Sequence, residues 1–96
     1  NADLSMQKLK NDYPFHSPLL QPAVEAFQTE LKKVMRFTPT IPYLSNLTGH
    51  WITEKEVQSE EYWIEHMLKT VQFSGCAKKI LQHSNVIFVE IGPGNT

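Results

Sequence analysis

Among the side chains that could carry chemistry, His16 lies where an extended segment gives way to a helix. Pro14 biases the residue before it away from helical geometry, while Ser17 and Pro18 are typical of a helix start. Junctions of this kind present catalytic groups on a rigid support, and an imidazole can accept and return a proton near neutral pH, as a general base must. Position alone favours the plainer interpretation, in which His16 merely precedes a helix.

The remaining chemical groups supply neither a metal site nor a nucleophile. His50, His66 and His83 show no metal-ligand spacing with one another or with His16, and Cys76 is the only cysteine. No Gly-x-Ser-x-Gly pentapeptide occurs in the sequence, although that frame usually supports a serine nucleophile at a strand–helix elbow. The sequence therefore offers a candidate base without a recognisable nucleophile.

Apolar periodicity and capping residues predict the helices that must position His16. After Ser17, apolar residues recur at helical spacing and predict a helix whose apolar face is Leu20, Val24, Phe27, Leu31 and Val34. Thr53–Glu56 has the spacing of a capping box, and Ser59 ahead of two glutamates is typical of another helix start. A further helix is predicted by the apolar positions Phe73, Cys76, Ala77, Ile80 and Leu81.

Two apolar segments are predicted to be strands. Ile41–Leu47 is followed by a turn at Thr48–Gly49 and by a short returning strand at 50–52. Val86–Ile91 is β-branched and nearly all apolar, which is typical of a strand buried on both faces of a parallel sheet. Gly92–Gly94 ends that strand, either as a plain tight turn or as a ligand loop at its carboxyl end. Helices alternating with such strands indicate an α/β fold.

Composition excludes several classes of protein. The chain has 96 residues, 41% of them hydrophobic, and a net charge of -1, which leaves no electrostatic footprint for nucleic acid. No apolar run approaches the ~20 residues that span a membrane. A single cysteine excludes a disulfide scaffold and fits a reducing, cytoplasmic setting. Because the sequence starts at Asn1 without Met and stops just after a predicted strand, we expect it to be a piece of a larger domain.

Four sequence blocks together resemble one family. They are Tyr13-Pro14-Phe15-His16-Ser17-Pro18-Leu19, Ile41–Gly49 with its Ser-Asn-Leu-Thr-Gly end, Tyr62-Trp63-Ile64-Glu65-His66 with Val71-Gln72-Phe73, and Phe88–Gly94 with its Glu-Ile-Gly-Pro-Gly end. In order and spacing they resemble the C-terminal portion of the acyltransferase domain of modular polyketide synthases. More distantly, they are similar to malonyl-CoA:acyl carrier protein transacylases.

The resemblance implies an α/β fold, a partial hydrolase-like acyltransferase core with helices packed on a small, largely parallel sheet. Residues 1–16 would form the exit strand of a small ferredoxin-like subdomain and the catalytic-histidine loop. Residues 17–96 would form the C-terminal part of the large acyltransferase subdomain. The family's nucleophilic serine, its arginine for the malonyl carboxylate and its oxyanion donors would all lie upstream of this chain.

The resemblance also implies an activity and the residues behind it. A Ser–His pair would transfer an acyl group, with malonyl expected, from acyl-CoA to the phosphopantetheine thiol of an acyl carrier protein, without a bound cofactor. His16 would be the general base, His66 would supply the backbone carbonyl that orients its ring, and Asn46 would help to structure the site. Tyr13 and Phe15 would take part in selecting the acyl unit: Phe15 matches the malonyl-type pattern and Tyr13 the methylmalonyl-type pattern.

Expectations about partners and alternatives complete the sequence-based picture. The partners would be acyl-CoA, the carrier protein, the rest of the acyltransferase domain and the neighbouring synthase domains, with neither nucleic acid nor membrane. Without its serine, the isolated chain should be inactive. One alternative is a non-catalytic remnant on which a separate acyltransferase docks, and another is a stand-alone small α/β protein.

Overall fold

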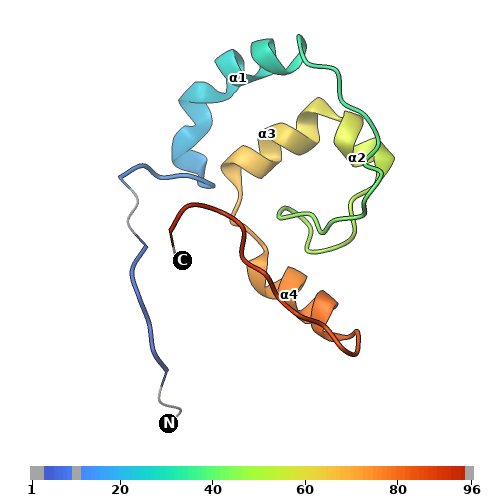
Figure 1. Cartoon of the computed structure of the whole chain (residues 1–96). Coiled ribbons are helices and arrows are strands. Elements are labelled where there is room, and N and C mark those ends of the chain that lie inside the picture. The colour runs from blue at the N-terminus through green and yellow to red at the C-terminus, as the bar shows by residue number, and fades with distance from the viewer. Residues whose placement is uncertain (1–3, 10–11, 95–96) are drawn as a thin grey trace.

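The computed structural model describes residues 4–9 and 12–94, and helices are the regular elements of these residues. In chain order they are η1 (Pro18–Ala23, a 3-10 helix), α1 (Val24–Leu31), α2 (Glu54–Gln58), α3 (Glu60–Leu68) and α4 (Phe73–Leu81). Figure 1 shows α1 running beside α3, with α2 at the start of α3. The chain then passes from α3 to α4, and the segment after α4 turns back along it.

The first helical segment begins where the sequence predicts, but it ends earlier. Ser17 is the N-cap, and its side chain accepts a hydrogen bond from the backbone N–H of Leu19. These first turns are 3-10 rather than α-helical, and Pro22, which lacks an N–H, lies inside them. The regular helix stops at Leu31, and Val34, predicted on the apolar face, is 57% exposed.

Arg36 explains why two helices can end side by side. Its guanidinium donates at 2.8 Å to the carbonyl oxygen of Leu31, the last residue of α1, and at 3.3 Å to that of Val34, which follows the helix. It also donates to the carbonyls of Val57 at 3.1 Å and Gln58 at 3.2 Å, at the end of α2. The last carbonyls of a helix have no partner within it, and this one side chain bonds to carbonyls at the ends of both helices.

The predicted capping residues of α2 and α3 are confirmed. Thr53 and Glu56 form a reciprocal capping box at the start of α2. Ser59 is the N-cap of α3, where it accepts from the backbone N–H of Tyr62. The helix predicted from apolar spacing over residues 73–81 is also present, as α4.

The predicted strands at Ile41–Leu47 and 50–52 do not form as regular strands: the two segments make a hairpin that is held by few bonds. Leu44 and Trp51 make one isolated antiparallel bridge, with Ser45 N–H donating to the His50 carbonyl at 2.8 Å. Gly49 adopts a φ of 73° in the turn, which is a conformation that glycine reaches without steric cost.

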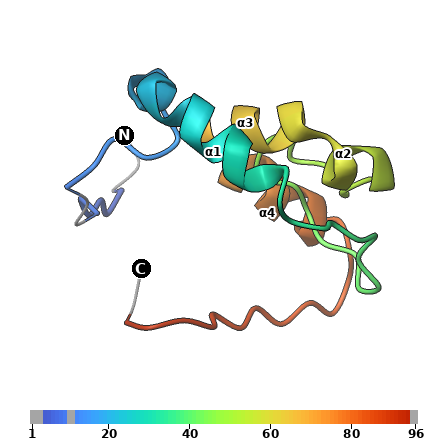
Figure 2. The ribbon, with the colours of Figure 1, turned by 90° about the horizontal axis from the view of Figure 1, so that it is seen from above.

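The predicted parallel sheet is not found among the described residues. Residues 86–91 run as an extended segment past α4 (Figure 2), and Ile87 and Ile91 are 87% and 92% exposed. Phe88 and Val89 border a hollow of about 350 Å³ together with Phe73 of α4. A strand needs a second strand to complete its hydrogen-bond ladder, and among residues 4–9 and 12–94 no strand pairs with this segment, so the α/β detail is not confirmed.

The segment before the helices is also irregular. Residues 4–9 have no regular secondary structure and are exposed, while residues 1–3 and 10–11 of the predicted exit strand lie outside the described residues. The division of the chain at residue 16 therefore stays a prediction.

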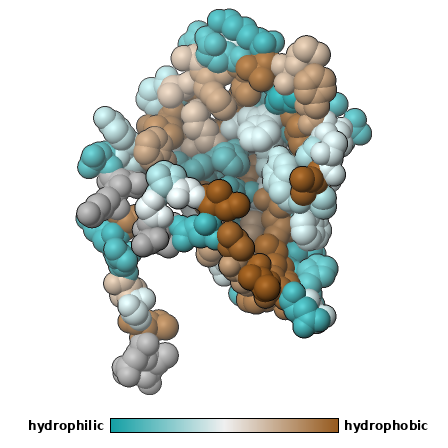
Figure 3. Space-filling view, in the orientation of Figure 1, coloured by the Kyte–Doolittle hydropathy of each residue, from teal (hydrophilic) through white to brown (hydrophobic). Residues whose placement is uncertain are grey.

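The core is small and lies between the helices and the hairpin. Leu31, Val57 and Tyr62 are its buried hydrophobic side chains, and Ser45 is buried completely. Figure 3 shows apolar surface gathered over the C-terminal segment and α4. Within the described part of the chain, no helix combines the length and the apolar character needed to cross a bilayer.

Candidate active site

His16 is held at a tight turn by its neighbours in the sequence. Its φ is 56°, in the left-handed region, which costs a residue with a side chain about 1 kcal/mol or more. Ser17 supports this turn, because its hydroxyl donates to the Pro14 carbonyl at 2.8 Å while accepting from Leu19. Backbone outliers of this kind cluster at functional sites, so the geometry of His16 favours the functional interpretation over the plain one.

The His16 ring meets the backbone carbonyl of His66, fifty positions further along the chain. Nδ1 of His16 lies 2.8 Å from that oxygen. A carbonyl oxygen can only accept, so this hydrogen bond requires the proton on Nδ1. In the neutral ring, Nε2 then keeps its lone pair and can act as a base.

The position of His66 in α3 explains why its carbonyl is available. The helix ends at Leu68, and the following N–H, that of Lys69, bonds to Glu65. His66 thus belongs to the last turn, whose carbonyls have no partner within the helix. The end of α3 supplies the acceptor, and the turn before η1 supplies the ring.

The side chain of His66 lies among aromatic rings. Its ring is perpendicular to that of His16, with centroids 5.2 Å apart, and lies 5.8 Å from the ring of Trp63 and 6.4 Å from that of Tyr62. Burial, followed by the nearby His16, lowers the pKa of His66 below its ordinary value of 6.5. His66 is therefore neutral at pH 7.

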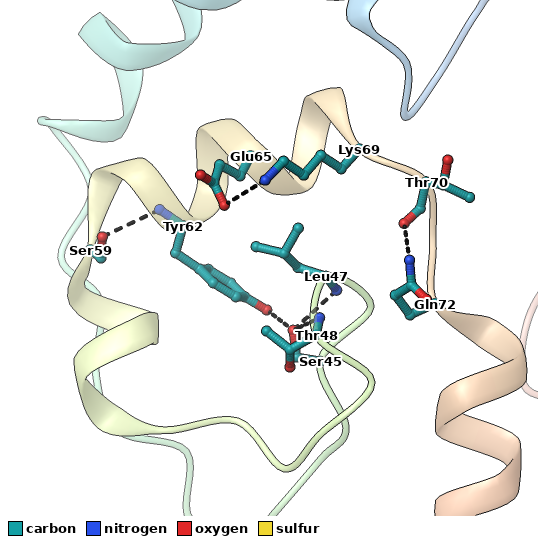
Figure 4. A network of polar contacts seen from close by, with 9 residues as sticks. All are labelled: Ser45, Leu47, Thr48, Ser59, Tyr62, Glu65, Lys69, Thr70 and Gln72. Atoms are coloured by element: carbon teal, nitrogen blue, oxygen red, sulfur yellow. Dashed lines mark hydrogen bonds and ion pairs between the residues drawn. The ribbon is translucent and has the colours of Figure 1, made fainter.

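Ser45 is a structural centre that the sequence alone did not single out. Its hydroxyl oxygen accepts from the backbone N–H groups of Leu47 at 3.1 Å and Thr48 at 3.3 Å, and it shares a short hydrogen bond with the Tyr62 hydroxyl (Figure 4). Burial raises the pKa of Tyr62, so its phenol stays protonated. The signal for it in the sequence is the Ser-Asn pair at the end of a predicted strand, where the family resemblance points to Asn46 instead.

Asn46 lies at the surface and connects two segments through its backbone. Its side chain is exposed, and its carbonyl oxygen accepts from the N–H of Gln72 at 2.7 Å, ahead of α4. Next to this contact Gly49 approaches Gly75 closely, and the Cys76 thiol donates to the Ser45 carbonyl at 3.3 Å. The structure thus brings His16 and His66 together, while Asn46 ties the hairpin to α4.

Tyr13 and Phe15 lie immediately before His16 and are both exposed. Their rings contact each other with centroids 5.8 Å apart and planes at 53°. The part of these two rings in selecting an acyl unit stays a prediction. In the described part of the chain, no three His, Cys, Asp or Glu side chains come together as a metal site would need.

Comparison with known proteins gives consistent matches in sequence. Polyketide synthase GfsB of Streptomyces halstedii is 34% identical over 90 residues, which cover 92% of this chain and 2% of the synthase. Phenolphthiocerol synthesis polyketide synthase type I Pks15/1 of Mycobacterium marinum is 33% identical over 91 residues, covering 94% and 4% respectively. No family profile matches the chain.

Solved structures agree with these relatives. The acyl transferase domain of ZmaA superposes with a TM-score of 0.78 and 39% identity, over 83% of this chain and 18% of that one. The acyl transferase domain of SpnD, solved in complex with 2-(pent-4-yn-1-yl)malonyl, superposes with a TM-score of 0.74 and 34% identity. This match covers 83% of this chain and 20% of the SpnD chain. The chain thus spans about a fifth of the solved domains that it matches.

Proposed function

Because this chain is a member of the acyltransferase domain family of polyketide synthases, we propose that it forms the part of such a domain that carries the general base, His16. The observation behind this proposal is the hydrogen bond from Nδ1 of His16 to the His66 carbonyl, because it leaves Nε2 as the proton acceptor. A backbone carbonyl thus fixes the proton on Nδ1 of His16 without an aspartate, and it adds no charge to the site.

The proposed reaction has two matched half-reactions. A serine from a part of the domain outside the printed sequence attacks the thioester carbonyl of acyl-CoA while His16 takes its proton. The tetrahedral intermediate collapses, the C–S bond breaks, and the proton passes from His16 to the departing CoA thiolate. The phosphopantetheine thiol of a carrier protein then attacks the acyl-serine, and His16 takes the thiol proton and returns it to the serine.

We further propose that the acyl group is malonyl. The SpnD domain was solved with 2-(pent-4-yn-1-yl)malonyl, a malonyl group that carries a substituent on its α-carbon, so by homology it supports the malonyl-type class of acyl group, and the choice of unsubstituted malonyl rests on Phe15. The exposed Phe15 ring next to His16 would leave little room for an α-methyl branch. Because one methyl group is worth about 10-fold to 200-fold in selectivity, Phe15→Ala in the complete domain should raise the use of methylmalonyl-CoA relative to malonyl-CoA by about 10-fold. If the use of methylmalonyl-CoA relative to malonyl-CoA does not change in Phe15→Ala, Phe15 does not select the acyl group.

The role of His16 is tested in the complete acyltransferase domain. His16→Ala should lower acyl-serine formation from malonyl-CoA by about 100-fold or more, the usual contribution of a general base. His83→Ala is the matched control, because that histidine is exposed after α4 and should leave the rate unchanged. Equal rates for His16→Ala and the unmodified domain would refute the assignment.

The isolated 96-residue chain should form no acyl-enzyme with malonyl-CoA, because the proposed nucleophile lies elsewhere in the domain. Intact-mass spectrometry of the purified chain measures this directly. A stable malonyl adduct on the chain would show that it holds its own nucleophile. That result would overturn the proposal that His16 and the nucleophilic serine come from different parts of the domain.

A further inference from the structure

His66 contacts His16 twice, and its backbone carbonyl accounts for only one of these contacts. The second is between the two rings, which stand at 79° to each other with centroids 5.2 Å apart. Perpendicular aromatic pairs at this separation are attractive because the electron-poor edge of one ring meets the electron-rich face of the other. The His66 side chain therefore restrains the His16 ring independently of the carbonyl.

The His66 ring is itself held in place from within the fold. Trp63 lies one helical turn before it and fixes its own indole by donating Nε1–H to the Val57 carbonyl at 2.8 Å. Tyr62 lies on the same face of α3, and its hydroxyl bonds to the fully buried Ser45. Rings three and four positions apart on a helix are neighbours, so both aromatic residues support His66 from one side.

We propose that the imidazole of His66 is a positioning residue for His16, and that the aromatic group Tyr62, Trp63 and His66 holds the His16 ring with Nδ1 on the His66 carbonyl. The inference rests on the proposed function of His16 as the base. It assigns a role to the His66 side chain, whereas the carbonyl could come from any residue at this position.

The chemistry of the reaction requires the ring of His66 to be neutral. When His16 takes a proton it becomes an imidazolium, and a second positive ring at the same distance would repel it. Burial keeps the pKa of His66 below its usual value, so a neutral ring faces His16 during the reaction. A flat, uncharged ring is thus the property that the proposal requires at residue 66.

The experiment compares variants that all keep the backbone carbonyl. His66→Ala removes the ring, whereas His66→Phe keeps a flat ring without titratable nitrogens. Nitrogen-15 NMR of the chain reports the ratio of His16 rings protonated at Nδ1 to those protonated at Nε2. His66→Ala should lower this ratio by about twofold to tenfold, the range expected for one edge-to-face ring pair, and His66→Phe should restore it.

Two outcomes would overturn the proposal. One is an unchanged tautomer ratio in His66→Ala while circular dichroism shows the helices intact. The other is a His66→Phe variant that behaves like His66→Ala, because the ring would then not be the cause. If His66→Ala does not fold, His66→Leu fills a similar volume without a flat ring and makes the same comparison with His66→Phe.

An activity measurement in the complete acyltransferase domain provides a second readout. His66→Ala should lower kcat by about twofold to tenfold and leave the KM for malonyl-CoA unchanged, since the ring acts on the base rather than on substrate binding. If the domain shows no acyl transfer at all, the proposed function fails, while the tautomer ratio still decides whether the His66 ring positions His16.

Discussion

The buried hydrogen bond between Ser45 and Tyr62 allows a quantitative prediction about stability. The Ser45 hydroxyl oxygen has two lone pairs, and the N–H groups of Leu47 and Thr48 already occupy them. The hydroxyl proton of Ser45 is therefore the one donated to Tyr62. Ser45 is 0% exposed, so water cannot replace a lost partner.

Tyr62→Phe removes the acceptor and leaves that proton buried without a partner. A buried donor in this state costs about 1–3 kcal/mol, and each kcal/mol lowers the melting temperature of a chain this size by about 4–8 °C. Urea or thermal unfolding followed by circular dichroism measures the change. Tyr13→Phe is the matched control, because it also removes a tyrosine hydroxyl, but from a residue that is 68% exposed.

A double-mutant cycle tests the reasoning more strictly. Ser45→Ala should cost more than Tyr62→Phe, because it also removes the acceptor for two backbone N–H groups. The double variant should be less destabilised than the sum of the two single variants by about 0.5–3 kcal/mol, as expected for groups in direct contact. Strict additivity, or a Tyr62→Phe chain as stable as the unmodified one, would refute the proposed hydrogen-bond arrangement.

Three further predictions follow from the helix ends, the hairpin turn and His66. Arg36→Ala should lower the free energy of unfolding by about 1.5–3 kcal/mol in a urea titration, because several helix-end carbonyls lose a charged donor. The control is Lys33→Ala, which breaks an exposed ion pair and should change the free energy of unfolding by less than about 1 kcal/mol. Gly49→Ala should lower the free energy of unfolding by about 1–2 kcal/mol, because alanine is strained at a φ of 73°. A clash is not the cause, since the new Cβ would lie 3.6 Å from the Gly75 backbone. An unchanged melting temperature in Gly49→Ala would contradict the left-handed conformation of this turn. The pKa of His66 is lowered from 6.5 in the folded chain, so the unfolded chain binds more protons below that pH and the free energy of unfolding should fall as pH drops through 6.5. His66→Gln should show a weaker decline of the free energy of unfolding with falling pH. An equal decline in both proteins would exclude His66 as its source.

The helix starts were predictable because capping is local. Ser17, Thr53 and Ser59 each bond to a backbone N–H two or three residues further along, so residue type and spacing contain the whole interaction. The apolar spacing predicts a helix that continues to Val34, whereas α1 ends at Leu31. Arg36 reaches the end of this helix and that of α2, twenty-one and twenty-two positions away, and no local pattern encodes that contact.

The predicted sheet shows the limit of pattern analysis in a different way. Val86–Ile91 has the composition of a buried strand, yet it runs extended beside α4, with residues 87–91 exposed. Composition describes which environment a segment suits, but a sheet forms only when a second strand completes the hydrogen-bond ladder. Among the described residues the second strand is not present.

For the site, the sequence by itself determined the identity of the candidate base, the cap that follows it and, through four matching blocks, the family. The tertiary structure decided which groups His16 meets. It placed the carbonyl at the end of α3 on Nδ1 of His16, set the ring of His66 against it, and made Ser45 rather than Asn46 the buried centre. These partners lie far apart in the chain, and their meeting depends on packing between elements, which residue type and local spacing do not specify.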